Sequence, residues 1–270
     1  MLSPPRPPGP GSGVNRRFAT LRAIMALMIR EMATRYGRSP GGYAWALLEP
    51  LGGVIILSVG MAIIVRAPPL GNSFVLFFAT GFLPFQIYQN LSTNVARSIN
   101  FSRALLFYPA VTWVDAVIAR FVLNTLTDVL AMLILFTGIL SVIDTSVLLD
   151  IGPVLSALGL AILTGLGVGM LNCVIFGLFP VWTQIWSIVT RPLFLVSGVI
   201  FLYDDMPKFA QDILWYNPLV HVTGLMRQGF YPTYRGDYIS ITYTVTVGLA
   251  CLFLGIVLMG RHHRDILNNG

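Results

Sequence analysis

The stretch VLSALGLAILTGLGVGMLNCVIFG at residues 154–177 contains no charged side chain. A helix needs about 20 apolar residues to cross the roughly 30 Å hydrocarbon core of a bilayer, so this stretch predicts a transmembrane helix. Comparable apolar stretches lie on both sides of it, at residues 46–65, 73–92, 115–140 and 239–260. A sixth, at residues 183–202, is less apolar because it contains Gln184 and Arg191. The sequence therefore predicts an all-α, polytopic membrane protein with six transmembrane helices.

The composition agrees with a membrane protein. Of the 270 residues, 56% are hydrophobic and 10% are charged, whereas about a quarter of the residues in a soluble domain are charged. With a mean hydropathy of +0.77, a soluble fold would expose large apolar patches to water. The net charge of +6 comes without a basic run interleaved with aromatic residues, so we expect no nucleic-acid partner.

The distribution of Lys and Arg predicts the orientation, because positive residues are enriched in cytoplasmic loops. Eleven arginines precede the first span, lie in the loop at residues 93–112 or follow the last span, and four basic residues lie in the opposite loops. This places both termini in the cytoplasm. Residues 1–15 are rich in Pro, Gly and Ser and are expected to form a disordered tail, and residues 261–270 a cytoplasmic tail.

Residues 16–42 precede the first span and predict an amphipathic helix in the cytoplasmic interface. The apolar residues recur at steps of three or four: Phe18, Leu21, Met25, Met28, Met32 and Tyr36. Arg30 and Glu31 fall on the opposite face, with Arg35 at its border. One interpretation is a simple membrane anchor. We favour a docking surface for a cytoplasmic partner, to which these three residues offer both signs of charge.

Residues 203–238 are too long for a turn and, with Pro207, Pro218 and Pro232, too broken to span the membrane. The apolar core from Leu219 to Phe230 has the length of a re-entrant or interfacial segment. Irregular backbone at membrane depth persists only where protein or a water-filled cavity covers it. We therefore expect a periplasmic re-entrant segment that caps an aqueous path, with an ordinary periplasmic loop as the alternative.

Polar residues inside predicted spans are costly and mark structural or functional sites. Asn124 and Asp128 are four residues apart on one face of the third span, and either a bond that holds the bundle or a path-lining role fits them. Gly165 and Gly169 place two small residues on one face of the fourth span. We expect them to allow close helix packing within the chain rather than dimerisation.

The sequence lacks the motifs of several catalytic sites. It contains no G-x-x-x-x-G-K-[ST] phosphate loop, no Cys/His spacing typical of a metal site and no G-x-S-x-G elbow. Asp204 and Asp205 are adjacent in a turn, where we expect them to cap a helix rather than to catalyse a reaction. We therefore expect no enzymatic activity, cofactor or metal in this chain.

Several short motifs lie at the predicted boundaries: Arg30-Glu31, TRYG at 34–37, GYAWALLEP at 42–50, GFLPF at 81–85, FYP at 107–109 and WYNPLVH at 215–221. Through these motifs, residues 18–260 resemble the polysaccharide-export permeases of ABC transporters, and most of all the capsular polysaccharide permeases. The WYNPLVH motif is the most specific of them. The Pro-rich residues 1–15 fall outside the resemblance.

The resemblance implies a six-helix subunit with an N-terminal interfacial helix and re-entrant helices between spans five and six. It implies a homodimer in the bacterial inner membrane, bound to two copies of a separate ABC ATPase subunit that binds ATP and Mg. The loop at 93–112, with Arg97 and Arg103, would be the coupling element on the ATPase. A lipid-linked capsular polysaccharide would pass to a periplasmic adaptor and an outer-membrane channel.

Under this hypothesis, two copies form a channel. Sugar rings stack on aromatic planes, and Arg or His would suit an acidic polymer because charge-assisted hydrogen bonds are the stronger ones. The candidates for the substrate path are Tyr88, Trp182, Trp186, Arg191, Tyr203, Trp215, Tyr216, His221 and Arg227. Alternatives are export of O-antigen or teichoic-acid chains, a secondary transporter with an ion site at Asn124 and Asp128, and a membrane enzyme that uses Asp204 and Asp205.

Overall fold

The computed structural model describes residues 19–35, 41–107, 111–143 and 149–268, and every regular element within these ranges is helical. The α-helices are α1 (Ala19–Arg35), α2 (Trp45–Ile64), α3 (Phe74–Ala96), α4 (Ser98–Leu106), α5 (Trp113–Val142), α6 (Ile151–Leu178), α7 (Trp182–Val196), α8 (Lys208–Leu214), α9 (Pro218–Phe230) and α10 (Ile241–Asn268). Two 3₁₀ turns, Gly42–Ala44 and Tyr203–Asp205, precede α2 and α8. The predicted all-α class is confirmed, whereas the expected tail at residues 1–15 lies outside the described residues.

Four helical stretches within the described residues are long and apolar enough to cross a membrane: Gly42–Ile64, Trp113–Val142, Ile151–Leu178 and Ile241–Leu267. They correspond to the first, third, fourth and sixth predicted spans. The other two predicted spans form α3 and α7, which do not meet the same criterion of length and apolar composition. The structure is therefore a polytopic membrane protein with at least these four candidate spans.

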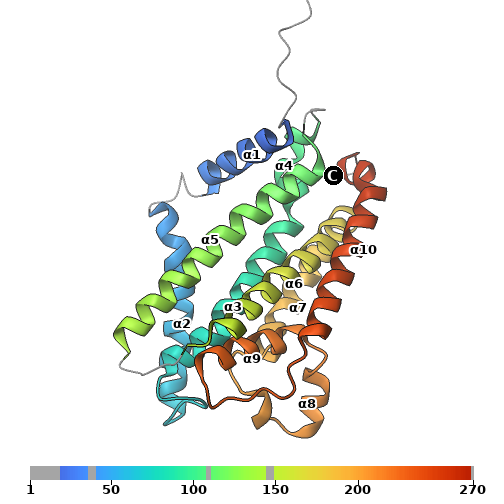
Figure 1. Ribbon diagram of the computed structural model, residues 1–270. Coiled ribbons are helices and arrows are strands. Elements are labelled where there is room, and N and C mark those ends of the chain that lie inside the picture. Colours follow the sequence, from blue (N-terminus) through green and yellow to red (C-terminus); the bar gives the residue numbers. More distant parts are fainter. Residues whose placement is uncertain (1–18, 36–40, 108–110, 144–148, 269–270) are drawn as a thin grey trace, which may run out of the picture.

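The helices form one bundle with two distinct ends (Figure 1). We name the end that carries α1, α4 and the C-terminal end of α10 the inner end, and the end that carries α8, α9 and the connection between α2 and α3 the outer end. α3 occupies the centre of the bundle, where it packs against α2, α5, α6 and α9. α6 packs between α3 and α10. The core is therefore built around α3 and α6.

Glycines allow α6 to approach α3 closely. A Cβ atom on Gly165 would lie 2.9 Å from the Leu91 Cβ, and one on Gly169 would lie 2.9 Å from the Val95 Cβ. Side chains at these positions would therefore separate the two helices. The expectation that this glycine pair serves packing within the chain is confirmed.

The fifth predicted span, residues 183–202, is wrong at its C-terminal boundary. α7 ends at Val196, and Gly198 adopts a left-handed φ of 71°. A left-handed glycine ends a helix because it has no Cβ to clash with the backbone. The carbonyls of Val199 and Phe201 then accept hydrogen bonds from Arg227 of α9, at 3.0 and 2.9 Å. This long-range partner stabilises a non-helical turn inside an apolar stretch.

One further helix differs in extent from its predicted segment. α10 continues through residues 261–268, because Ile266 packs in a buried cluster with Met170 and Cys173 of α6. α1 is described from Ala19 to Arg35, and Phe18 and Tyr36 of the expected 16–42 helix lie outside the described residues.

Candidate functional site

The inner-end cluster, which consists of Arg30, Glu31, Asn94, Phe101 and Arg120, joins four helices. The Arg120 Nε donates to the Glu31 carboxylate at 2.9 Å, and its Nη1 donates to the Asn94 backbone carbonyl at 3.1 Å. Glu31 is 2% exposed and Arg120 is 8% exposed. Buried charges persist only when they are paired and hydrogen-bonded, as these are. The ion pair therefore fixes α1 against α5 and the inner end of α3.

The Phe101 ring of α4 contacts both arginines of this cluster. The guanidinium carbon of Arg120 is 4.2 Å from the ring centroid and that of Arg30 is 5.0 Å from it. The Arg30 Nη2 also donates to the Phe101 backbone carbonyl at 3.1 Å. Both cations lie within the range of attraction to an aromatic ring. Phe101 thus links α4 to both α1 and α5.

The interpretation that Glu31 offers its charge to a cytoplasmic partner does not fit the structure, because its carboxylate is buried against Arg120. Arg30 likewise directs its guanidinium toward α4. The exposed side chains of α1 include Arg22 and four large apolar ones, Leu21, Met25, Ile29 and Met32. Arg35 ends α1, and its side chain lies outside the described part of the chain.

Two polar pairs form a seam between α3 and α5, which we call the α3–α5 seam. The Asn94 Nδ2 donates to the Asn124 Oδ1 at 2.9 Å, and the Asn90 Nδ2 donates to the Asp128 Oδ1 at 3.1 Å. Asn124 also donates to the Arg120 carbonyl at 2.7 Å, which connects the seam to the inner-end cluster. Asp128 lies halfway along α5, so the polar contacts continue to its midpoint.

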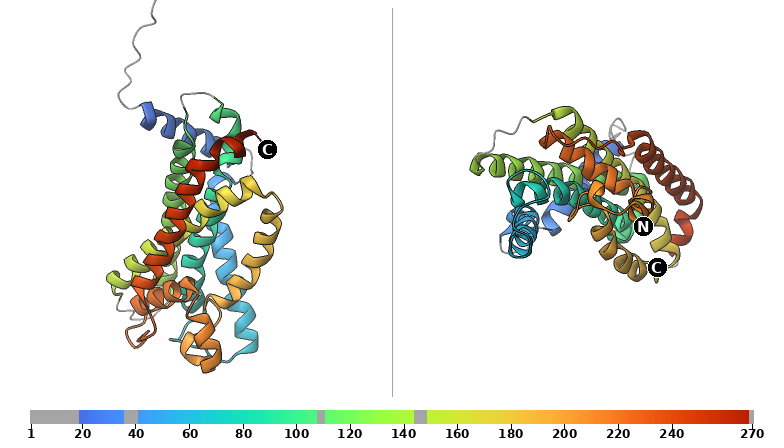
Figure 2. Two further views of the ribbon diagram at one scale, coloured as in Figure 1. Left: turned by 90° about the vertical axis from the view of Figure 1, so that its right-hand side faces the viewer. Right: turned by 90° about the horizontal axis from the view of Figure 1, so that it is seen from below.

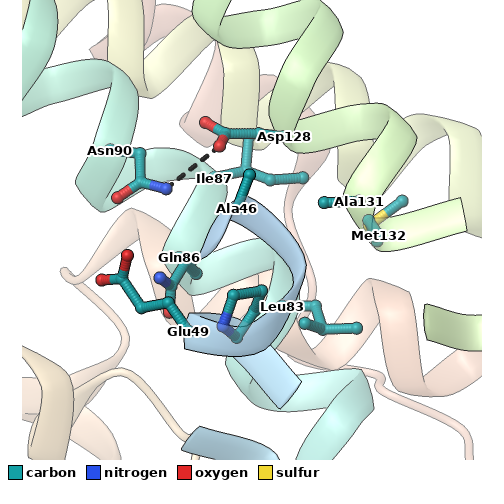
Figure 3. A pocket seen from close by; sticks show the side chains of 10 residues that line it. Ala46, Glu49, Leu83, Gln86, Ile87, Asn90, Asp128, Ala131 and Met132 are labelled. Atoms are coloured by element: carbon teal, nitrogen blue, oxygen red, sulfur yellow. Dashed lines mark hydrogen bonds between the residues drawn. The ribbon is translucent and has the colours of Figure 1, made fainter. Parts of the chain in front are cut away.

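A small polar pocket extends the seam toward α2 (Figure 3). Its volume is about 30 Å³, and its polar lining consists of Glu49 of α2, Gln86 and Asn90 of α3, and Asp128 of α5. Asn90 and Asp128 face each other, while Glu49 and Gln86 lie together on another side of the pocket. This volume is enough for about one water molecule. Two carboxylates and two amides can bind water or hydroxyl groups there.

α7 lies at the edge of the bundle and presents polar and apolar faces (Figure 2). None of its residues is buried within the described part of the chain, and Arg191 is exposed. The Trp182 indole N–H donates to the Asn172 Oδ1 of α6 at 3.1 Å. Tyr88 and Trp186 line one cavity of about 290 Å³ between α7 and the bundle. The structure thus brings two of the predicted path residues together there.

His221 of α9 is fully buried at the outer end, and both of its ring nitrogens have partners. The Ser240 backbone N–H donates to the His221 Nδ1 at 3.3 Å, so Nε2 carries the proton and donates to the Trp215 carbonyl at 2.8 Å. This geometry requires the neutral imidazole. Burial lowers the pKa of His221 below its ordinary value, although the hydrogen bond to the Trp215 carbonyl acts to raise it. His221 therefore ties α9 to the chain on both sides of it.

The Arg227 side chain is 1% exposed, and its contacts are with other parts of the protein fold. Its guanidinium donates to the Val199 and Phe201 carbonyls and lies 4.3 Å from the centroid of the Phe77 ring. These contacts hold the turn after α7 against α3 and α9. His221 and Arg227 are thus buried, rather than on an open surface as a direct contact with a polymer would require.

The remaining predicted path residues form an outer aromatic cluster. The Tyr203 ring stacks on Tyr238 with centroids 3.9 Å apart, and the Trp215 ring contacts Tyr216 at 5.6 Å and Tyr243 at 4.8 Å. Tyr216 is 70% exposed, so it is the member most accessible to a ligand.

Asp204 lies beside this outer cluster, in the 3₁₀ turn that also contains Tyr203. Burial raises the pKa of the Asp204 carboxyl above its ordinary value, although a hydrogen bond from Tyr234 opposes this shift. Within the described residues, no three His, Cys, Asp or Glu side chains gather as metal ligands would.

Arg97 lies directly before α4, and Arg103 lies in the last turn of the helix. Arg97 precedes the helix and is exposed. The Arg103 Nη2 donates to the Leu267 carbonyl at 2.7 Å, which ties α4 to the end of α10. Arg97 is therefore free to meet another molecule at the inner end, whereas Arg103 contributes to the arrangement of α4.

Sequence analysis missed several residues of these sites: Glu49, Gln86, Asn90, Asn94, Phe101 and Arg120. Asn90 lies in the predicted span 73–92, and Asn94 follows four residues later in the predicted loop 93–112. Because α3 extends to Ala96, the two asparagines share one helix, and a longer second span would have shown a polar pair like that of Asn124 and Asp128. Phe101 had no comparable signal, because its role depends on arginines from two distant helices.

Comparison with known proteins places the whole bundle in one group. A model of the ABC-2 type transporter family matches residues 22–231. The chain is 30% identical over 246 residues to the polysialic acid transport protein KpsM of Escherichia coli, an alignment that covers 91% of this chain and 95% of that protein. It is 32% identical over 247 residues to the capsule polysaccharide export inner-membrane protein BexB of Haemophilus influenzae, with 91% and 92% covered. For the capsule polysaccharide export inner-membrane protein CtrC of Neisseria meningitidis serogroup B, the identity is 26% over 246 residues, with 91% and 92% covered.

Proposed function

The chain belongs to the ABC-2 type transporter family, and from this premise we propose that it is the permease subunit of an ATP-driven exporter of capsular polysaccharide in the bacterial inner membrane. The observation that carries the proposal is similarity over 91% of the chain to proteins named for capsule polysaccharide export. The polymer is lipid-linked in this proposal, and the candidate spans of the chain provide its route across the bilayer.

A separate ABC ATPase subunit supplies the energy in this scheme. The sequence has no phosphate loop with which to bind ATP, so ATP and Mg belong to the partner. Two copies of the permease assemble with two copies of the ATPase, and a periplasmic adaptor and an outer-membrane channel accept the polymer. A homodimer would cover the polar face of α7, whose side chains are unburied in one chain.

α3 and α7 supply the two further spans of a six-span topology. At a rise of about 1.5 Å per residue, the 23 residues of α3 extend roughly 35 Å, enough to cross the hydrocarbon. α7 is shorter, with 15 residues, but it runs beside the bundle from the inner toward the outer end (Figure 2). Non-helical backbone after Val196 then completes the crossing where α9 covers it.

The inner end faces the cytoplasm, and α8 and α9 form a re-entrant segment on the periplasmic side. The excess of arginines before α2, around α4 and after residue 260 supports this orientation. Eleven of the 13 residues of α9 are buried, which supports a segment enclosed by the bundle rather than a surface loop. α1 lies in the cytoplasmic interface, with its exposed apolar side chains toward lipid.

The substrate path follows the exposed and half-buried members of the predicted set. Arg191, Trp182 and Trp186 on α7 and Tyr216 at the outer end are accessible within one chain. The polar pocket at Glu49, Gln86 and Asp128 adds hydroxyl-binding groups at membrane depth. Tyr203, Trp215 and His221 shape the outer end of this path through contacts with one another, and Arg227 does so by binding the turn at Phe201.

Affinity purification of the chain from its native membrane in mild detergent, followed by mass spectrometry, tests this function. We expect a stoichiometric ABC ATPase subunit, which is lost when the exposed inner-end residue Arg97 is changed to Glu. The matched control is Arg66→Glu, because Arg66 is also exposed but lies in the connection between α2 and α3, which is part of the outer end. A chain that purifies alone and moves or modifies a substrate in liposomes without ATP would refute the proposal.

A further inference from the structure

The inner-end cluster connects the helix proposed to face the ATPase with the centre of the bundle. There Phe101 of α4 packs against the guanidinium groups of both Arg30 and Arg120. Arg103 holds its other turn to α10. A rotation or displacement of α4 would therefore move the Phe101 ring against two charged groups.

Arg120 cannot follow such a movement without changing its other contacts. Its Nε donates to Glu31 at 2.9 Å and its Nη1 donates to the Asn94 carbonyl at 3.1 Å, and both charged residues are at least nine-tenths buried. Breaking a buried ion pair leaves an uncompensated charge, so intermediate positions are unfavourable. An element of this kind favours discrete arrangements over a gradual response.

The contacts of Arg120 continue into the membrane. Its carbonyl accepts from Asn124, and Asn94, whose carbonyl it binds, donates to the same Asn124. One helical turn further, Asn90 donates to Asp128 at the polar pocket. Arg120 thus connects the Phe101 ring to the Asn94–Asn124 hydrogen bond, and the Asn90–Asp128 hydrogen bond lies one helical turn beyond it.

We propose that Arg120 is the positioning residue that couples α4 to the α3–α5 seam, so that ATP-driven movement of α4 changes the packing of α3 and α5 along the export path. This inference rests on the proposed function, because it takes the ATPase to act on α4. Arg120 touches neither the nucleotide nor the polymer. It acts through Phe101, Glu31 and Asn94. When Arg120 is replaced, ATP hydrolysis continues while less polymer is exported per ATP.

The test uses the complete complex of permease and ATPase in liposomes, with ATP hydrolysis and polymer export measured on the same sample. Arg120→Lys keeps a positive charge beside Glu31 but cannot hold Glu31, Asn94 and Phe101 at once, because an ammonium lacks the planar fork of a guanidinium. Phe101→Leu keeps an apolar side chain and removes the aromatic face. The matched controls are Phe253→Leu, at a 67% exposed site of α10, and Arg66→Lys at the outer end.

We expect both test variants to retain ATPase binding and hydrolysis, while polymer exported per ATP falls at least about fivefold, the lower range of a coupling between sites. The double variant should lose little more than either single variant, because the two residues act through one contact. The two controls should keep the wild-type ratio. Thermal unfolding of each complex separates coupling from loss of fold.

An unchanged ratio of export to hydrolysis in both test variants would overturn the inference. This holds whether both activities stay normal or fall by the same factor, as a merely structural role predicts. If Arg120→Lys fails to accumulate, the ratio in Phe101→Leu alone decides. A wild-type chain that binds no ATPase would instead refute the proposed function, because there would be no ATP hydrolysis with which to compare export.

Discussion

His221 shows how one buried residue can report the state of the outer end. Its Nε2 donates to the Trp215 carbonyl while its Nδ1 accepts from the Ser240 N–H, so the neutral ring satisfies both sides. A second proton on Nδ1 would place two donors against each other. The arrangement therefore links the proton occupancy of one ring to the contact between α9 and the start of α10.

We expect the complex to lose thermal stability as the pH falls below about 6.5, the ordinary pKa of His. Burial lowers the pKa of folded His221, so the unfolded chain binds the proton more readily and acid favours unfolding. The pH range of this loss begins at the pKa of His221 in the unfolded chain and extends down through its lower pKa in the folded protein. Differential scanning fluorimetry of the detergent-purified protein between pH 8 and pH 5 measures it.

The His221→Gln variant separates this group from the others that titrate in the same range. Gln can donate to the Trp215 carbonyl and carries no charge, so its unfolding midpoint should fall less with acid. Asp204 acts in the opposite direction, because its pKa is raised and the stability it contributes is lost as the pH rises from about 3.8. A wild-type slope in His221→Gln would show that another group causes the acid sensitivity.

Single residues differ in how far the sequence predicts their surroundings. Asn124 and Asp128 stood out because polar side chains in an apolar helix must find a partner, and they do so across the α3–α5 seam. Glu31 was placed on the wrong side of α1 because charge alone suggested exposure. Its burial depends on Arg120, which is 89 residues away in sequence.

At the scale of elements, the packing of α3 on α6 depends on small residues. We expect Gly169→Val to destabilise the bundle by about 1–3 kcal/mol, the usual effect of inserting methyl groups into a packed interface. A Cβ at this position would lie 2.9 Å from the Val95 Cβ and 3.0 Å from the Ser92 carbonyl oxygen, so α3 has to move away. The shift of the thermal unfolding midpoint measures the effect.

The control for this change lies in the same helix. Gly159 has open space around its Cα, with no described heavy atom within 4 Å of an added Cβ. Gly159→Ala should therefore be neutral or stabilise α6 by up to about 1 kcal/mol, because Ala is the better helix former. Equal losses at both positions would indicate that α6 responds to helix propensity and not to its contact with α3.

Elements were predictable where apolar length alone determines them. α2, α5, α6 and α10 follow from stretches that are apolar over at least 20 residues. The end of α7 was not predictable in this way. It depends on the left-handed Gly198 and on the Val199 and Phe201 carbonyls, which accept hydrogen bonds from Arg227 of α9. α4 was expected only as a loop, since nine residues give too short a pattern to separate a helix from a connection.

At the scale of the whole molecule, the faces that one chain leaves uncovered indicate where a second surface or the polymer belongs. Most exposed large side chains are apolar and suit lipid. α7 differs, because it leaves Gln184, Ser187 and Arg191 exposed on a segment beside the bundle. An exposed cation at membrane depth is stable only beside water, a counter-charge or another protein. This is the part of the chain where we place the polymer and the second copy.

We expect Arg191→Gln to lower export of an acidic polymer by about tenfold, because a charge-assisted hydrogen bond contributes more than about 1.5 kcal/mol. Arg191→Lys should retain most of the export, since a point charge still attracts carboxylates. Surface polymer relative to total polymer, measured in cells with equal amounts of permease, provides the readout, with Arg66→Gln as the matched control. Co-purification of the ATPase should stay unchanged in each variant, which separates a path residue from a coupling residue. Normal export by Arg191→Gln combined with Trp215→Ala would place the polymer elsewhere, and the pocket of Glu49, Gln86 and Asp128 would then be the next surface to change.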